Sequence, residues 1–542
     1  MSKPKKRTAR ARPPKPAKPA AASPRVETSP KERGQITALV DEIRKDPLAD
    51  APRQVLADML EQRGEVARGQ LIHLQIRRAG LASWDPQVIA LELEERALLA
   101  EHEKRWRAEL PELAGVTWGP FSRGFVGTVA FQTFDAFVEH GAACCAAAPV
   151  HGIAIPWPRS GKQRELAAIA GARELTVVGT AMRKQDLQWL ASSPLLATIR
   201  SLTLLDSQLQ SLATLLASPH VGALEALRLP LHLLDDGSIF KLTQTALPGL
   251  ATLDLSTGTA EEDYGSGSGR RSPRRTLSNY AAIALAGWRG LAKIRALDVS
   301  ASKFGCEGLS ALLKSPYSAG LKALAVRNIA DAKWDVDDSL TAFGGGPAGT
   351  LDELDVSDND LDSQGAADMA GCRALQELKV LRLERVVSKH FDRLAKAPWL
   401  DSLRVLACGE AALLPIVKRT PKQLHTLRVV PDGPAPRELV RRLAAAPLPT
   451  VTALDLSDAR LGDDGLRLLG TVETLPGVVA LQLAGGGVAP RFTRAAAEQF
   501  TRSPLAAQLT SLETGFAELD RLPAAPRIAI GHGEYKGALR YL

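Results

Sequence analysis

Two short segments contain residue types that catalysis uses, but neither has the spacing that the chemistry requires. Ser160-Gly161-Lys162 carries the Gly-Lys pair of a phosphate-binding loop, yet Pro156 stands where that loop needs its first glycine. The GSGSG run at Gly265–Gly269 has glycine where a nucleophile elbow needs its serine. We therefore expect no nucleotide site and no serine nucleophile in this chain.

Histidine and cysteine residues are scattered through the sequence without the spacing of a metal site. The nine histidines form no H-E-x-x-H motif, and the five cysteines form no C-x-x-C pair. An odd number of dispersed thiols also argues against a disulfide framework, which makes a reducing cytoplasm the expected compartment. The sequence thus predicts a protein that is not an enzyme and has no metal, cofactor or small-molecule substrate.

Charged residues recur at one position of a leucine pattern, LxxLxL, that runs through most of the chain. The position lies between the last two leucines, so in an extended strand its side chain points away from the face that the leucines bury. We predict that these residues are exposed on a sheet surface and bind a partner: Arg228, Asp254, Asp298, Asp355, Arg382, Arg404, Arg428 and Asp455.

Three arginines of this set, Arg382, Arg404 and Arg428, come from consecutive repeats. Neighbouring strands of a parallel sheet lie only about 5 Å apart, so the guanidinium groups would repel one another unless an anionic partner or nearby acids neutralise them. The alternative is a hydrated surface on which the arginine stems splay apart. Serine follows each aspartate of the set by two places, a recurrence that we attribute to the repeat rather than to a calcium site.

The positive charge of the chain is concentrated at its N-terminus. Eleven Lys or Arg residues against two Glu give residues 1–33 a formal charge of +9, which leaves −1 for the rest of a chain whose net charge is +8. The Lys-, Arg-, Pro- and Ala-rich composition predicts a disordered tail, which either binds nucleic acid or acts as a solubilising tether. The candidate nucleic-acid residues are Lys3, Lys5, Lys6, Arg7, Arg10 and Arg12.

The elements that position the charged residues are predicted by the leucine pattern itself. In Val451–Leu469, VTALDLSDARLGDDGLRLL, a strand would bury Leu454 and Leu456, and a short helix would follow a turn. Such a unit buries both apolar faces only when it stacks on similar units. The central anchors are mostly 22–31 residues apart, and an insertion at 257–276 lengthens one interval to 44: Val129, Ile153, Leu175, Leu202, Leu227, Leu253, Leu297, Leu324, Leu354, Leu381, Leu403, Leu427, Leu454, Leu481 and Leu512.

The repeat resembles the leucine-rich repeat family, especially its longer, helix-containing ribonuclease-inhibitor-like class. Leu351–Leu361, LDELDVSDNDL, fits LxxLxLxxNxL with Asn359 in the asparagine place. Other repeats hold Ser207, Gly258 or Ala459 there, so we expect most of the asparagine ladder to be absent. The resemblance implies an α/β solenoid, a horseshoe with parallel strands on its concave face and helices on its convex face.

The region before the repeats has the periodicity of a small all-α module. Apolar residues at helical spacing predict four helices between Gln35 and Arg107, the second of which ends at Gly64. Asp50–Arg53, Leu71–Gln75 and Phe121–Val126 resemble segments of the bacterial repeat-companion domain, a short module of uncharacterised function found beside repeats. We interpret the polar residues of these segments as helix caps and salt bridges rather than as a site.

These patterns divide the chain into a disordered tail (1–33), a helical repeat-companion domain (34–120), a solenoid (121–519) of about 15 units and a C-terminal cap (520–542). No apolar run approaches the roughly 18–20 residues of a membrane span, and the N-terminus lacks the apolar core of a secretory signal. We expect a cytoplasmic, non-enzymatic scaffold that binds a protein partner through its concave face. The alternative is association with nucleic acid through the tail.

Overall fold

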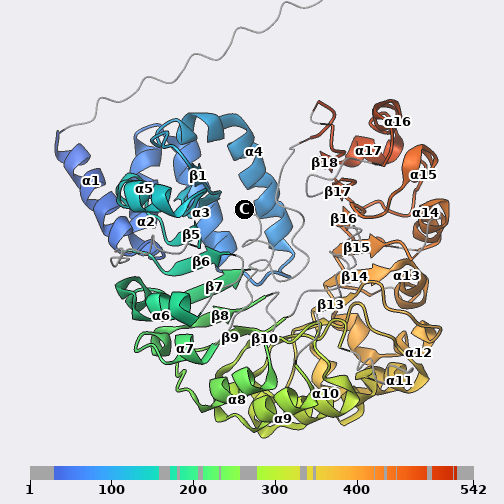
Figure 1. Cartoon of the computed structure of the whole chain (residues 1–542). Helices are drawn as coiled ribbons and strands as arrows, with labels where there is room; N and C mark the ends of the chain where they lie inside the picture. Colours follow the sequence, from blue (N-terminus) through green and yellow to red (C-terminus); the bar gives the residue numbers. More distant parts are fainter. Residues whose placement is uncertain are drawn as a thin grey trace, which may run out of the picture.

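A computed structural model shows a long curved sheet with helices along its outer side (Figure 1). It describes residues 30–157, 171–179, 184–205, 212–230, 234–256, 277–329, 339–345, 349–419, 421–432, 436–446, 448–484, 491–516 and 518–521. The Ser160-Gly161-Lys162 segment, the Gly265–Gly269 run and the predicted insertion at 257–276 lie outside these residues. The candidate nucleic-acid residues of the tail also lie outside them: Lys3, Lys5, Lys6, Arg7, Arg10 and Arg12.

Within the described residues the main sheet contains sixteen strands, whose order follows the sequence from β1 and β4 to β18. Strands β4–β18 pair in parallel, β1 pairs antiparallel with β4 at the first edge, and β2 and β3 form a separate antiparallel pair. The strands are β1 (Val116–Trp118), β2 (Phe121–Ser122), β3 (Phe125–Val126), β4 (Thr128–Phe131), β5 (Gly152–Pro156), β6 (Glu174–Val178), β7 (Ser201–Leu205), β8 (Ala226–Arg228), β9 (Thr252–Asp254), β10 (Ala296–Asp298), β11 (Ala323–Ala325), β12 (Glu353–Asp355), β13 (Val380–Leu383), β14 (Val405–Gly409), β15 (Thr426–Val430), β16 (Ala453–Asp455), β17 (Ala480–Gln482) and β18 (Ser511–Glu513).

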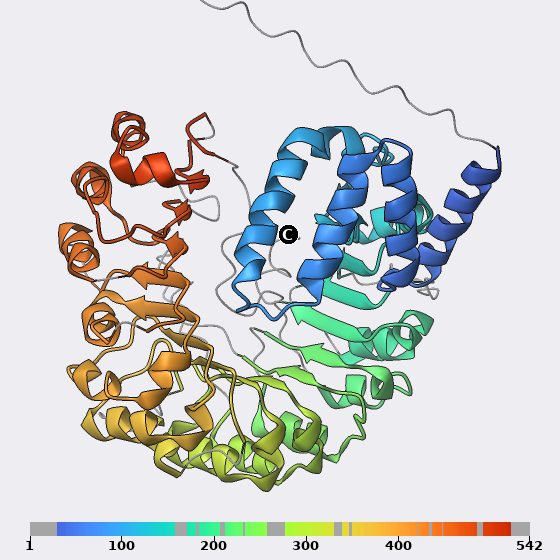
Figure 2. The same ribbon diagram turned by 180° about the vertical axis from the view of Figure 1, so that it is seen from behind.

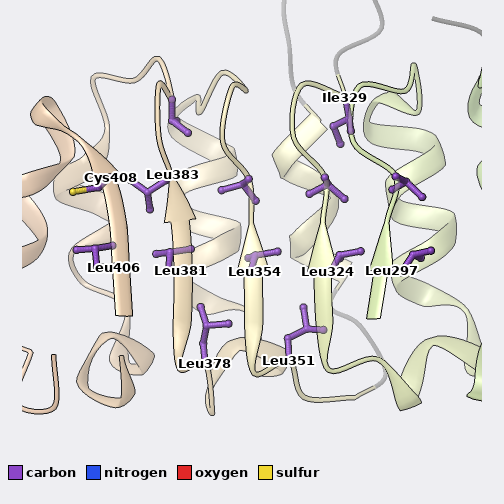
Figure 3. Close-up of a cluster of buried hydrophobic side chains, with 14 of the residues drawn as sticks. Leu297, Leu324, Ile329, Leu351, Leu354, Leu378, Leu381, Leu383, Leu406 and Cys408 are labelled. Carbon is purple, nitrogen blue, oxygen red and sulfur yellow. The ribbon is translucent and has the colours of Figure 1, made fainter. Parts of the chain in front are cut away.

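The predicted anchors fix the register of this sheet, with one exception. Cα pairing joins Val129 to Ile153 and continues from anchor to anchor as far as Leu512, except that Leu406 takes the place of the predicted Leu403. Each anchor that Figure 3 shows side by side is at most 1 % exposed, and burying a leucine side chain contributes about 1.5–3 kcal/mol. The stacked repeats therefore confirm the predicted α/β solenoid. The anchors in that view are Leu297, Leu324, Leu354, Leu381 and Leu406.

Short helices return the chain along the outer side of the sheet, as both views show (Figures 1 and 2). Several helical turns begin at Ser-Pro pairs, in which the proline cannot continue a preceding helix. In three of these pairs the serine Oγ accepts a backbone N–H of the next helical turn, and the proline takes the first helical position, where it needs no N–H partner. The pairs thus start the next helical turn as well as ending the previous helix: Ser193-Pro194, Ser315-Pro316 and Ser503-Pro504.

The α-helices are α1 (Pro30–Lys45), α2 (Ala51–Gln62), α3 (Val66–Ala79), α4 (Gln87–Arg107), α5 (Phe134–Ala147), α6 (Lys184–Ser192), α7 (Leu212–Leu216), α8 (Asp236–Gln244), α9 (Asn279–Gly287), α10 (Gly305–Lys314), α11 (Ser363–Gly371), α12 (Phe391–Leu394), α13 (Glu410–Val417), α14 (Pro436–Ala445), α15 (Gly462–Leu469), α16 (Arg494–Phe500) and α17 (Pro504–Gln508). The short 3₁₀ turns are η1 (Pro194–Ala197), η2 (Val221–Ala223), η4 (Arg289–Lys293), η5 (Pro316–Gly320), η6 (Ser339–Gly345), η7 (Arg373–Leu375) and η8 (Pro398–Ser402).

The four predicted N-terminal helices, α1–α4, form a module at the first end of the sheet. Gly64 ends α2 with a φ of +83°, a left-handed conformation that glycine adopts without strain. Arg53, which is 1 % exposed, donates to the carbonyls of Arg123 (2.8 Å) and Pro47 (2.6 Å). Gln75 accepts the backbone N–H of Gly124 at 2.6 Å. Arg53 of α2 and Gln75 of α3 thus hold the helices against the turn between β2 and β3.

The first helix begins earlier than the sequence predicts. Helix α1 starts at Pro30, inside the predicted disordered tail 1–33, so residues 30–33 are helical rather than disordered. Pro30 suits the first helical position because its missing N–H would be unpaired there in any case. Glu32 in the first turn adds a negative charge at the positive end of the helix dipole.

Candidate functional site

The residue that follows each central anchor forms a polar row on the face of the sheet opposite the leucines. Seven of the eight predicted partner-binding residues lie in this row, although their repeats span more than half of the solenoid. From β7 to β18 the order of the row, fixed by Cα pairing, is Thr203, Arg228, Asp254, Asp298, Ala325, Asp355, Arg382, Ala407, Arg428, Asp455, Gln482 and Glu513.

The charged members of the row that the sequence predicts to be exposed are buried, which corrects that prediction. Asp254 and Asp455 are 0 % exposed, and the most exposed of the seven, Arg228, reaches only 9 %. Strands about 5 Å apart crowd the side chains of the row. The side chains turn along the sheet toward neighbouring polar groups, as Arg228 does by donating to Ser201 Oγ at 2.7 Å. The seven residues are Arg228, Asp254, Asp298, Asp355, Arg382, Arg428 and Asp455.

Arg404 lies outside the row, so the predicted stack of three arginines is wrong. Strand β14 begins at Val405, and Cα pairing places Ala407 between Arg382 and Arg428. The small Ala407 separates the two guanidinium groups by two strand spacings instead of one. Arg404 itself is half-buried and precedes the strand.

The error in this repeat has a definite cause in the sequence. Residues 400–408 read LDSLRVLAC, which fits the leucine pattern in two frames that differ by three residues. The observed frame uses Leu406 as the central anchor instead of Leu403. In this frame Leu403, Leu406 and Cys408 are all 0 % exposed. The other frame would point Leu406 away from the core, so packing selects between them.

The repeated Asp-x-Ser pairs form turns at the ends of the strands. In each pair the aspartate Oδ1 accepts the backbone N–H of the serine two residues later, the geometry of an Asx turn. The serines extend this link between repeats, because Ser300 and Ser357 accept the backbone N–H groups of Arg327 and Glu384, at 3.1 Å each. The recurrence thus has a structural explanation. The pairs and their distances are Asp254–Ser256 (2.8 Å), Asp298–Ser300 (2.8 Å), Asp355–Ser357 (3.0 Å) and Asp455–Ser457 (2.9 Å).

Acidic residues of neighbouring repeats neutralise the arginines of the row. Arg382 Nη2 lies 3.3 Å from Glu353 Oε2. Arg428 Nε lies 2.8 Å from Glu384 Oε1, its Nη1 lies 2.7 Å from Asp455 Oδ2, and its Nη2 contacts the Asp458 carboxylate. Burial lowers the pKa of Arg428, but these three carboxylates outweigh burial and raise it above its ordinary value. The sequence leaves open whether an anionic partner or nearby acids neutralise these arginines. The structure shows that nearby acids do so.

Asp254 and Asp298 are neighbours in the row and carry like charges. Burial, followed by the proximity of Asp298, raises the pKa of Asp254 well above its ordinary value. Asp254 Oδ2 has no hydrogen-bond partner among the described residues, which agrees with a carboxyl group that retains its proton. In the described part of the chain, no group of three or more His, Cys, Asp or Glu residues is placed to hold a metal ion.

Charged side chains become accessible just after strands β11, β12, β13 and β16 end. The Asp358 carboxylate accepts hydrogen bonds from Arg327 (2.9 Å) and from Arg385 (2.5 and 3.0 Å), whose side chains are 37 % and 40 % exposed. The Asp458 side chain is 53 % exposed, and Val387 is 69 % exposed. We call these residues the strand-end rim: Arg327, Asp358, Arg385, Val387 and Asp458. The leucine pattern does not reveal them, because they follow the strands at positions that it leaves unspecified.

The adjacent thiols of Cys144 and Cys145 lack the electrostatic environment of a nucleophile. Burial raises the pKa of Cys144 to about 11, and burial together with Cys144 raises the pKa of Cys145 to about 12. Both thiols thus stay protonated at neutral pH, whereas a catalytic cysteine requires a lowered pKa. Among the residues that the structure describes, no helix is both long and apolar enough to span a membrane.

Two segments of the chain match a family model described as "Leucine Rich repeat", residues 350–370 and 448–470. Each begins just before a strand of the main sheet, β12 or β16; the first ends within α11 and the second at the residue after α15. No curated protein matches the chain. Among solved structures, "Crystal structure of Rad7 and Elc1 complex in yeast" is 12 % identical and covers 91 % of this chain and 100 % of that chain, with a TM-score of 0.30. The two matched segments and the register that they share with the other strands support a leucine-rich repeat protein.

Proposed function

We propose that this protein is a non-enzymatic scaffold that binds a protein partner through the concave side of its solenoid. The strand-end rim carries this proposal. It joins paired charges of both signs to Val387, an apolar side chain that is 69 % exposed. Aligned strands present such groups on a rigid curved surface, the usual binding surface of repeat proteins. The half-buried Arg404, which immediately precedes β14, is a further candidate contact.

The buried row supports this surface in our proposal. Arg228, Asp254, Asp298, Asp355 and the other row residues hold neighbouring strands together and end them in defined turns. Through Arg428, the row also positions Asp458 of the rim. A partner would thus contact the rim, whose geometry depends on the residues beneath it.

Charge matching favours a protein over a polyanion as the partner of this surface. Arg327 and Arg385 share the Asp358 carboxylate, and Arg428 is surrounded by three carboxylates. A nucleic-acid surface needs positive charge in excess, because its affinity comes from phosphate contacts and counterion release. The matched charges here would instead give directional hydrogen bonds and suppress wrong partners.

A pair of matched variants tests the rim. The test variant combines Arg385→Glu with Val387→Ser, which changes the rim. The control variant is Arg437→Glu on the outer helix α14. Arg437 is also an exposed arginine paired with an aspartate, here from the next repeat. Proteins that co-purify with the two variants and the wild-type chain are compared by quantitative mass spectrometry. We expect the rim variant to lose a protein that the α14 variant retains. Identical profiles for both variants would contradict the proposal.

The tail supplies the alternative, association with nucleic acid. The charge of +9 on residues 1–33 favours it, since the rest of the chain carries −1. Deleting residues 1–29 should then abolish any salt-sensitive binding of DNA or RNA, measured by fluorescence anisotropy at low salt. A full-length chain that binds neither nucleic acid at low salt would eliminate this alternative. We also propose that the N-terminal module is a repeat-companion domain, as the contacts of Arg53 and Gln75 with the β2–β3 region support.

A further inference from the structure

The helical pair α3–α4 lies inside the curve of the sheet and reaches strands of the opposite half of the solenoid. Both overall views show α4 on the inner side, away from the outer helices (Figures 1 and 2). Three polar contacts join the α3–α4 loop and α4 to parts of the chain 270, 341 and 415 residues away. They are Ser83 Oγ to Glu353 Oε1 (3.5 Å), His425 Nε2 to Trp84 O (2.9 Å) and Arg96 Nη1 to Ser511 Oγ (3.0 Å).

The other end of the module is held much more firmly. Trp106 of α4 packs with Leu71, Phe121 and Val126 in one apolar cluster, and Gln75 donates to Phe121 O at 3.0 Å. Among the described residues, the apolar clusters that include α4 side chains extend no further along the chain than Val126. The module is thus fixed to the first strands by a core, and it meets β12, β15 and β18 through polar contacts.

This asymmetry determines which contact can open. The polar contacts contribute little net free energy, because opening would let water reach both partners and replace the hydrogen bonds that break. Separating an apolar core costs more, because water does not compensate for the exposure of apolar side chains. Opening would therefore separate the module from β12–β18 while the module stays on β1–β4, and it would uncover the inner side of the sheet.

We propose that α3–α4 is an intramolecular clasp that occupies the concave side, and that the protein partner must displace it. This inference rests on the proposed function of the concave side. The clasp also indicates which chemistry the partner brings to β18. Arg96 donates to Ser511 at this strand. Burial lowers the pKa of Arg96, and the carboxylates of Glu92 on α4 and then of Glu513 on β18 partly offset this effect. A partner that replaces the clasp would offer a basic side chain at this point.

The distance between two spin labels measures the opening directly. The labels are attached at Glu101→Cys on α4 and Arg441→Cys on α14, both well exposed in the wild-type chain. Cys145 and Cys306, which are partly buried, are replaced by serine to prevent their labelling. Electron–electron double resonance on the full chain should show one distance population when the clasp is closed.

Removing the Arg96–Ser511 bond should shift this population. We expect Arg96→Ala and Ser511→Ala each to raise the open-to-closed ratio roughly 5- to 10-fold, and the double variant to add little, because both changes remove the same bond. Arg78→Ala is the matched control, since Arg78 pairs with Glu92 and Glu95 inside the module. The clasp is wrong if Arg96→Ala and Ser511→Ala leave the distances unchanged, or if Arg78→Ala changes them equally.

A second measurement separates the clasp from the proposed function. Recovery of the rim-dependent partner by co-purification should rise for Arg96→Ala in proportion to its open-to-closed ratio. Equal recovery from an opened and a closed chain would overturn displacement by the partner. The rim variants alone decide the proposed function, and the spin-label distances need no partner. The experiments can therefore contradict the clasp without contradicting partner binding at the rim, and the reverse.

Discussion

Replacing Arg428 by methionine tests whether the buried row stabilises the solenoid through matched charges. The Arg428 side chain is 8 % exposed and lies within 2.8 Å of carboxylates from Glu384 and Asp455. Methionine keeps much of the packing volume but leaves the fully buried Asp455 without its cation. Breaking a buried ion pair in this way costs about 3–5 kcal/mol, because the remaining charge stays desolvated. We therefore expect Arg428→Met to lower the free energy of unfolding by about that amount.

Urea unfolding followed by circular dichroism measures this loss, and hydrogen exchange in β15 and β16 locates it. Adding Asp455→Asn removes the orphaned charge while its amide oxygen can still accept the Ser457 N–H, so the double variant should recover roughly 2 kcal/mol. Arg437→Ala, which breaks an ion pair whose side chains are 61 % and 50 % exposed, should cost less than about 1 kcal/mol. The reasoning fails if Arg428→Met costs no more than Arg437→Ala, or if the double variant is less stable than the single one.

Three further variants test other buried polar groups. Burial and Asp298 raise the pKa of Asp254, so the folded state keeps a proton that the unfolded state releases, and stability falls as pH rises above the ordinary aspartate range. Asp254→Asn should therefore raise the melting temperature at pH 7–8 and make it depend less on pH. An unchanged dependence of the melting temperature on pH would contradict this. Burial lowers the pKa of His151 from 6.5 to about 4, so the stability of the folded protein should fall as pH decreases from 6.5 to about 4. The melting temperature of His151→Gln should decrease less over the same pH range than that of the wild-type chain. Asn359, 3 % exposed, bonds Ile329 N, Val326 O and Val356 O, and Asn359→Ala should cost about 1–3 kcal/mol in urea unfolding; a loss near zero would mean that its bonds are replaced.

The solenoid could be predicted from sequence because its register depends on residues that must be buried. Leucines that alternate with polar residues specify which face of each strand is internal, and a one-residue slip would reverse every side chain. The prediction fails only where the sequence offers two equivalent frames, at residues 400–408. There both frames supply an apolar residue at every required position, so only the packing of Leu406 in three dimensions distinguishes them.

The exposure of the charged row could not be predicted in the same way. Alternation shows on which face a side chain lies, but its exposure depends on groups contributed by other repeats. Arg382 meets Glu353 from the preceding strand, and Arg428 meets Glu384 from two strands earlier. The clasp is still less predictable, since Arg96 and Ser511 are 415 residues apart and belong to no common pattern.

Stacked arginines in a sequence can indicate an anionic ligand that neutralises them, but their repulsion also limits how the chain can fold. Like charges about 5 Å apart in a buried row destabilise it, so a chain that folds without a ligand must separate or neutralise them internally. This chain does both, with Ala407 between two arginines and carboxylates beside each. Charges that are matched within the row are already used by the fold. The binding surface of such a solenoid is therefore better sought among charged residues that remain accessible after this matching, which here lie at the strand-end rim.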